Sequence, residues 1–258
     1  MPKLSTSLSM MFTEIDFPDR FAAAARAGFK GVEYMFPYDY EKQMLRDRLA
    51  ANGLTQVLHN LPAGDWAAGE RGIACLPDRT AEFQSGVARA IEYAAALGCT
   101  KLNCLAGIAP PGLDPNAARQ TFIANLKYAA PRLQDAGIQL TIEAVNTRDI
   151  PGFFLNRTSQ ALGFIEAVGS GNLFLLYDVY HMQMMGEEVM PMIKRNLTLI
   201  RHMQIADAPG RHEPGTGGID FAALFEFIDE SGYAGWVGCE YKPAGTTEEG
   251  LGWARPYL

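Results

Sequence analysis

Hydrophobic residues occur in short runs that alternate with amphipathic segments from one end of the chain to the other. Eight runs of five to seven residues are rich in aliphatic or β-branched side chains. Such runs are typical of strands buried on both faces of a parallel sheet. The predicted strands are residues 3–9, 31–35, 54–60, 101–105, 138–143, 173–178, 199–204 and 235–240.

Helical patterns fill the intervals between these runs. They cover residues 17–27, 41–51, 80–97, 116–135, 158–168, 187–195 and 221–231. Several are followed by a glycine, the residue that most readily ends a helix: Gly28, Gly53, Gly98 and Gly137. Two connections, residues 60–77 and 144–156, are longer than ordinary loops between a strand and a helix, and loops of that length are usually functional.

The alternation predicts an α/β fold, a (β/α)8 barrel that forms one domain over residues 1–258. A barrel of about 250 residues spends roughly 31 residues on each unit, which matches the spacing of the runs. An open doubly wound sheet is the alternative, and it usually carries a glycine-rich phosphate loop after an early strand. Here the first predicted strand is followed by MMFTEIDFP, which contains no glycine. The barrel is therefore favoured.

The last four predicted strands all end on an oxygen-bearing side chain: Glu143, Asp178, Gln204 and Glu240. A single carboxylate in this position often only caps the following helix. In a barrel, however, the carboxyl ends of the strands face one common mouth, where barrel enzymes carry their chemistry. Four such residues on successive strands indicate a shared site.

This set of side chains predicts a metal site formed by Glu143, Asp178, Gln204 and Glu240. Carboxylate and amide oxygens select a hard divalent cation, Mg²⁺ or Mn²⁺, over zinc. Without a cation, three converging carboxylates would repel one another and at least one would take up a proton.

Histidines add further candidates. His181 follows Asp178 by three residues and is expected to contact the substrate. His59 lies near the end of the third predicted strand, where it either contacts the substrate or makes a buried hydrogen bond. The side chains of His202 and Gln204 are two residues apart and point the same way, with His202 one layer deeper. His202 is either an interior histidine or a substitute ligand for Gln204. The role of Glu33, in the second strand, stays open between structure and function.

A small acid as substrate would need a cation in the site. The candidates are Arg71 on the first long loop, Lys242 just beyond Glu240, and Arg211; Arg71 and Lys242 are preferred. Trp66, on the same loop as Arg71, is expected to help seal the site from water.

Composition excludes some functional classes. A formal net charge of −7 argues against nonspecific binding of nucleic acid, which depends on neutralising phosphates. The four cysteines show no CxxC spacing. Neither a signal-peptide pattern nor a run of membrane-spanning length is present, so the expected location is the cytoplasm, without membrane attachment. A homo-oligomer is compatible with the sequence, which does not fix the number of subunits.

Long motifs resemble one family across nearly the whole chain. They include VEYMFPYDY at residues 32–40, HNLPAGDWAAGERGIACLP at 59–77, YDVYHMQ at 177–183 and GWVGCEYKP at 235–243. They are similar to those of the hydroxypyruvate isomerases, within the xylose-isomerase-like barrels that also include ketose 3-epimerases. The resemblance implies isomerisation of hydroxypyruvate to tartronate semialdehyde (2-hydroxy-3-oxopropanoate), with Glu143 and Glu240 as the acid/base pair. One departure is Gln204, because the sugar epimerases usually have a histidine at that position.

The chemistry suits this set of residues. A carbonyl moves to the adjacent carbon when one proton is removed beside it, an enediolate forms, and a proton returns to the neighbouring carbon. Three alternatives stay open: a related substrate such as a 2-oxo-tetronate or a small ketose, a metal-dependent phosphodiesterase, and a non-catalytic barrel that binds a small acid. The phosphodiesterase is disfavoured, because it should have more than four histidines and a basic face.

Overall fold

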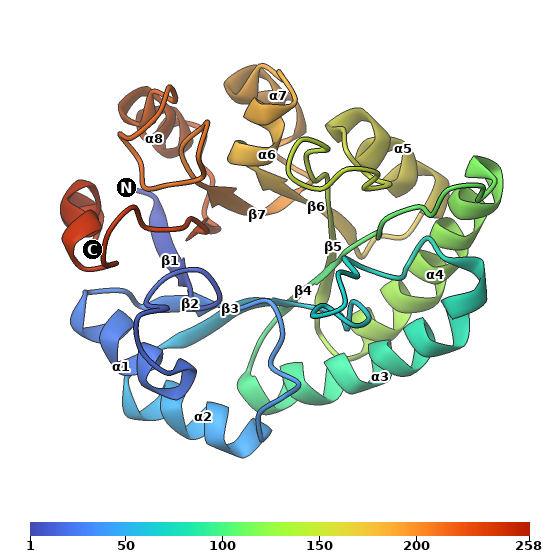
Figure 1. Ribbon diagram of the computed structural model, residues 1–258, viewed down its shortest axis with the longest axis horizontal. Coiled ribbons are helices and arrows are strands. Elements are labelled where there is room, and N and C mark those ends of the chain that lie inside the picture. The colour runs from blue at the N-terminus through green and yellow to red at the C-terminus, as the bar shows by residue number, and fades with distance from the viewer.

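The computed structural model describes residues 1–258 and forms a closed barrel of eight parallel strands that pair in sequence order. In Figure 1 the strands lie at the centre and the helices surround them. The strands are β1 (Lys3–Ser7), β2 (Gly31–Glu33), β3 (Thr55–Asn60), β4 (Lys101–Cys104), β5 (Gln139–Glu143), β6 (Leu173–Asp178), β7 (Ile200–Ile205) and β8 (Trp236–Cys239). The predicted fold is confirmed.

The long helices follow the predicted pattern closely. They are α1 (Phe17–Arg26), α2 (Lys42–Ala51), α3 (Thr80–Leu97), α4 (Pro115–Asp135), α5 (Thr158–Val168), α7 (Val189–Asn196) and α8 (Phe221–Glu230). Gly98 ends α3 at φ 64°, and Gly169 ends α5 at φ 66°. Glycine adopts this left-handed conformation without a steric penalty from a Cβ atom.

Three further helical segments complete the structure. The 3₁₀ turn η1 (Pro77–Arg79) precedes α3, and the 3₁₀ helix η2 (Glu249–Tyr257) closes the chain. Helix α6 (Val179–Met184) starts directly after β6, because Oδ1 of Asp178 accepts a hydrogen bond from the backbone N–H of His181 at 3.0 Å. Asp178 therefore does cap a helix, in addition to facing the barrel mouth.

Strand register sets two of the predicted strand ends side by side. Asp178 on β6 pairs with Gln204 on β7, and Gln204 pairs with Gly238 on β8. Glu240 follows two residues after Gly238. The barrel interior below these strand ends is largely polar, whereas the hydrophobic core of 66 buried residues fills mainly the layer between sheet and helices.

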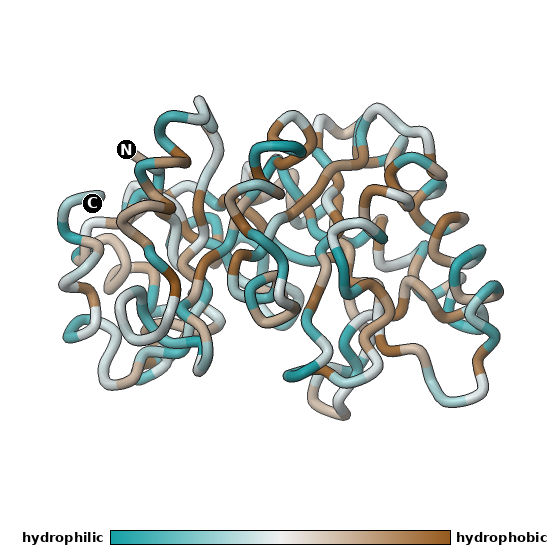
Figure 2. The backbone as a smooth tube through the Cα atoms, turned by 90° about the horizontal axis from the view of Figure 1, so that it is seen from above, coloured by the Kyte–Doolittle hydropathy of each residue, from teal (hydrophilic) through white to brown (hydrophobic).

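Hydrophobic and hydrophilic stretches alternate along the entire tube in Figure 2. No helix is both long and apolar enough to span a membrane.

Candidate active site

A pocket of about 600 Å³, including its part open to solvent, lies among the carboxyl ends of the strands. Eight residues that the sequence analysis named as candidates line it: Glu33, Trp66, Arg71, Glu143, His181, Gln204, Arg211 and Glu240.

Glu143, at the end of β5, is a buried carboxylate at this pocket. Its Oε2 accepts a hydrogen bond of 2.9 Å from the side-chain amide of Asn103. Burial, followed by the nearby charges of Asp178 and Glu240, raises the pKa of Glu143 well above its ordinary value. In the absence of a cation, Glu143 therefore tends to hold a proton.

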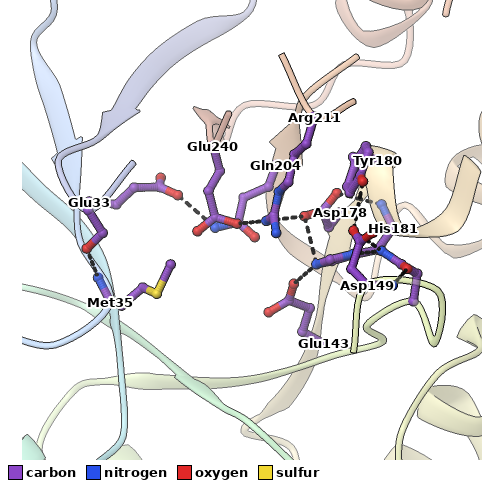
Figure 3. Close-up of polar contacts among 12 residues, drawn as sticks. Glu33, Met35, Glu143, Asp149, Asp178, Tyr180, His181, Gln204, Arg211 and Glu240 are labelled. Carbon is purple, nitrogen blue, oxygen red and sulfur yellow. Dashed lines mark hydrogen bonds and ion pairs between the residues drawn. The ribbon is translucent and has the colours of Figure 1, made fainter. Parts of the chain in front are cut away.

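Asp178 and His181 lie beside Glu143 (Figure 3). Nε2 of His181 is 3.7 Å from Oε1 of Glu143 and 3.6 Å from Oδ2 of Asp178. Burial raises the pKa of Asp178 to about 6, although the Arg211 guanidinium and backbone N–H groups lower it. Burial, together with the positive charge of Arg211, lowers the pKa of His181 well below its ordinary value. The imidazole is therefore neutral at physiological pH.

Glu240, directly after β8, is held by Arg211. Nη2 of Arg211 donates to Oε2 of Glu240 at 2.6 Å and lies 3.8 Å from Oδ2 of Asp178 (Figure 3). Burial nevertheless raises the pKa of Glu240 to about 8. The backbone of Arg211 has a φ of 58°, which is uncommon for a residue other than glycine.

Gln204 is oriented by a buried carboxylate on the other side of the barrel. Its amide Nε2 donates to Oε1 of Glu33 at 2.8 Å, and Glu33 also accepts from Oγ of Ser5 and lies 2.9 Å from Nε2 of His202. Although burial alone would raise it, these neighbours lower the pKa of Glu33. Oε1 of Gln204 is buried and has no hydrogen-bond partner.

Arg71 reaches the pocket from the long loop after β3. Its guanidinium carbon lies 4.1 Å from the centre of the Trp66 ring, and its Nη1 donates to the backbone carbonyls of Trp66 and Glu70. The arginine is thus stacked and anchored, with N–H groups left over for an anion.

Two candidates for contact with the substrate do not line the pocket. His59 lies on β3 between Leu58 and Asn60, which do line it, so the alternation of side chains along a strand turns His59 outward. It is fully buried, with its ring 6.0 Å from that of Tyr38, and burial lowers its pKa to about 3. Lys242 is exposed and lines a separate surface pocket. Neither side chain therefore lines this pocket, and Arg211 is the cation that lies beside Glu240.

Two polar side chains that contact the site residues were not predicted from the sequence. Asn103 lies one residue before the end of β4 and donates a hydrogen bond to Glu143 at the end of β5. Asn146, in the second long loop, hydrogen-bonds to the ring of His181. The length of that loop indicated a function but did not single out this residue.

The donor atoms suit a divalent cation. One ligand atom each from Glu143, Asp178 and His181 lie within 4.8 Å of one another, so these residues could hold a metal ion. The unpartnered oxygen of Gln204 is a buried acceptor that lacks a donor, and a cation would satisfy it. A bound cation would also favour the ionised form of the carboxyl groups whose pKa values burial has raised.

Comparisons with known proteins agree with this architecture. A model of the xylose isomerase-like TIM barrel family matches residues 21–257. The chain belongs to this family. It is 54% identical over 257 residues to the hydroxypyruvate isomerase of Escherichia coli (strain K12), with 100% of both chains covered. A 2-oxo-tetronate isomerase of Cupriavidus necator is 47% identical, with 100% of this chain and 99% of the relative covered.

Among solved structures, an AP endonuclease, family 2, from Brucella melitensis superposes with a TM-score of 0.97 at 44% identity. The match covers 100% of this chain and 99% of that one. Its name corresponds to the phosphodiesterase alternative, but the geometry of the present pocket, rich in carboxylates and holding one histidine, gives that activity no specific support.

Proposed function

We propose that this protein is an isomerase that interconverts hydroxypyruvate and tartronate semialdehyde. Its similarity to isomerases of small 2-oxo acids supports an isomerase of this substrate class. The two compounds are isomers: one proton leaves C3, one is added at C2, and the hydroxyl proton on O3 is exchanged for one on O2. No redox partner is needed.

Glu143 and Glu240 are the proposed acid/base pair. Both line the pocket, and they come from strand ends three strands apart, so a bound substrate could meet them from two directions. Their shared place at the pocket carries the proposal. Burial raises the pKa of both carboxyl groups, that of Glu240 to about 8, and a carboxyl group with a pKa near the working pH can both give and accept a proton. In one direction, a glutamate removes the C3 proton and the second glutamate protonates C2.

We further propose that Glu143, Asp178, Gln204 and Glu240 would hold a divalent cation, Mg²⁺ or Mn²⁺. When bound, the cation would polarise the substrate carbonyl and stabilise negative charge on oxygen. Gln204 suits this role because Glu33 occupies its N–H side and leaves its oxygen free.

Arg71 is the proposed receptor of the substrate carboxylate. A planar guanidinium binds a carboxylate through two parallel hydrogen bonds, and stacking on Trp66 fixes its plane in advance. Trp66 would also limit the access of water to the enediolate, which water would otherwise protonate without control.

The proposed setting is cytoplasmic metabolism of small carbohydrate-derived acids such as glyoxylate and hydroxypyruvate. All four cysteines are free and buried, which is consistent with a reducing compartment.

Incubating the protein with hydroxypyruvate and Mg²⁺ or Mn²⁺ in D₂O tests the proposal. We expect tartronate semialdehyde to form and deuterium to appear on carbon. Glu240→Gln should abolish turnover while the substrate still binds. If the wild-type protein binds hydroxypyruvate but gives neither product nor deuterium exchange, a binding protein would be the better explanation.

A four-carbon 2-oxo-tetronate is the second candidate substrate, favoured by the relative at 47% identity. Measuring kcat/KM for three- and four-carbon substrates under the same conditions separates the two. A higher value for the four-carbon acid would reassign the substrate without changing the proposed chemistry.

A further inference from the structure

Asn146 is a fully buried residue in the loop that follows β5. Its Oδ1 accepts hydrogen bonds from the backbone N–H groups of Arg148 at 3.0 Å and Asp149 at 2.8 Å. A backbone N–H can only donate, so these two contacts determine which end of the amide is oxygen. The NH₂ group of Asn146 must therefore point the other way.

The two hydrogens of that NH₂ group have two acceptors. One is Oδ2 of Asp149 at 3.0 Å, which is itself held by the hydroxyl of Tyr180 at 2.7 Å. The other is Nδ1 of His181 at 2.6 Å. Because Asn146 donates here, Nδ1 must offer its lone pair, and a neutral imidazole in that state carries its proton on Nε2.

The opposite edge of the ring faces the active site. His181 lines the pocket, and its Nε2 is 3.6 Å from Asp178 and 3.7 Å from Glu143. Both separations exceed a good hydrogen-bond length, so the N–H is not committed to either carboxylate. Figure 3 shows the ring between these carboxylates and Asp149.

We propose that Asn146 is a positioning residue that fixes His181 as a neutral Nε2–H donor to a substrate oxygen and keeps it from coordinating a metal ion. A metal ligand must offer a lone pair, which this tautomer lacks at Nε2. The proximity of His181 to Glu143 and Asp178 then reflects substrate binding, and the cation is left to oxygen ligands. The donor role rests on the proposed isomerase function, whereas the tautomer does not.

Long-range ¹H–¹⁵N NMR of histidine-labelled protein reads the tautomer directly. The chain has only four histidines, and the signals lost in His181→Gln identify those of His181. We expect the wild-type ring to carry its proton on Nε2, both with EDTA and with saturating Mg²⁺. A proton on Nδ1, or the loss of the Nε2 proton when Mg²⁺ is added, would overturn the proposal.

Asn146→Asp tests the positioning role. Its carboxylate can still accept from the two backbone N–H groups but cannot donate to His181, so the ring proton should move to Nδ1. We expect kcat/KM to fall on the order of 10²-fold, the usual cost of losing one donor to a developing oxyanion. Asn116→Asp, an exposed change of the same chemistry on α4, should alter neither tautomer nor rate.

The outcomes separate the two proposals. An unchanged tautomer or an unchanged rate in Asn146→Asp would show that Asn146 does not position His181 for the reaction. Absence of turnover in the wild-type protein would instead refute the isomerase, while the NMR result would still decide the tautomer.

Discussion

The side-chain amide of Gln204 on β7 donates to the carboxylate of Glu33 on β2, across the interior of the barrel, at 2.8 Å. The two residues are 171 positions apart in the chain. A carboxylate can only accept, so this contact turns the oxygen of Gln204 away from Glu33 and leaves it without a partner. A flexible amide is thereby held in one orientation, with its oxygen free to accept.

Glu33→Gln should weaken metal binding, because an amide at position 33 can accept or donate and no longer fixes the orientation of Gln204. Loss of such an outer contact typically costs about 10- to 100-fold in metal affinity. Titration of the metal-free protein with Mn²⁺, followed by electron paramagnetic resonance, measures the change. Glu226→Gln, an exposed change on α8, is the matched control. If the wild-type protein, Glu33→Gln and Glu226→Gln all bind Mn²⁺ with equal affinity, Glu33 does not orient Gln204 for metal binding.

Gly238→Ala should displace Glu33. A Cβ atom at position 238 would lie 2.4 Å from both carboxylate oxygens of Glu33, which three neighbouring groups hold in place. Overpacking of this kind costs about 1–3 kcal/mol of unfolding free energy, measurable by urea denaturation. Gly163→Ala, in α5 with no atom near its new Cβ, should instead be neutral or stabilising. If Gly238→Ala leaves the free energy of unfolding unchanged, the contacts around Glu33 adjust to the added methyl group without a measurable cost.

Stability of the metal-free protein should fall as the pH rises from about 7 to about 8.5. Glu240 has a pKa of about 8 in the folded protein, against roughly 4.3 in an unfolded chain. When folding raises a pKa, the stability that this contributes is fully present below the pKa of the unfolded chain. It is lost as the pH rises through the pKa of the folded protein. His59 and His181, whose pKa values folding lowers, act in the opposite direction only below about pH 6.5.

Thermal unfolding in EDTA at a series of pH values measures this effect. Glu240→Gln should flatten the slope, and saturating Mg²⁺ should raise the melting temperature most at the alkaline end, because the cation binds ionised carboxylates. A melting temperature in EDTA that climbs above pH 7 would contradict the buried, protonated glutamates.

Arg71→Ala should raise KM for hydroxypyruvate by about 10- to 100-fold, the usual value of a hydrogen bond to a charged group. Steady-state kinetics at saturating Mg²⁺ gives the comparison. Lys242→Ala removes the other preferred cation, and since that side chain is exposed outside the pocket, KM should stay within about twofold. The reverse ranking would show that the carboxylate lies toward Lys242.

The strand ends could be found from sequence because strand period and strand order are local properties. Once the runs of β5 to β8 are read as successive barrel strands, Glu143, Asp178, Gln204 and Glu240 must face one mouth. The same pattern, applied residue by residue, would also have turned His59 outward, because residues one apart on a strand face opposite sides.

The choice of cations depended on loop geometry. Arg211 and Lys242 both lie in irregular segments, where no periodicity relates sequence position to direction. Arg211 donates to Glu240 from a backbone with a positive φ, and nothing in its residue type predicts that conformation.

The sequence by itself determined the barrel, the order of its strands and the carboxylates at its mouth, because hydrophobic period and chain order are sufficient for these. Only the tertiary structure decided which way the ambiguous side chains point. Gln204 and His181 can each present a donor or an acceptor, and Glu33 and Asn146 settle the choice through contacts between segments far apart in the chain. Such contacts exist only after the barrel has closed.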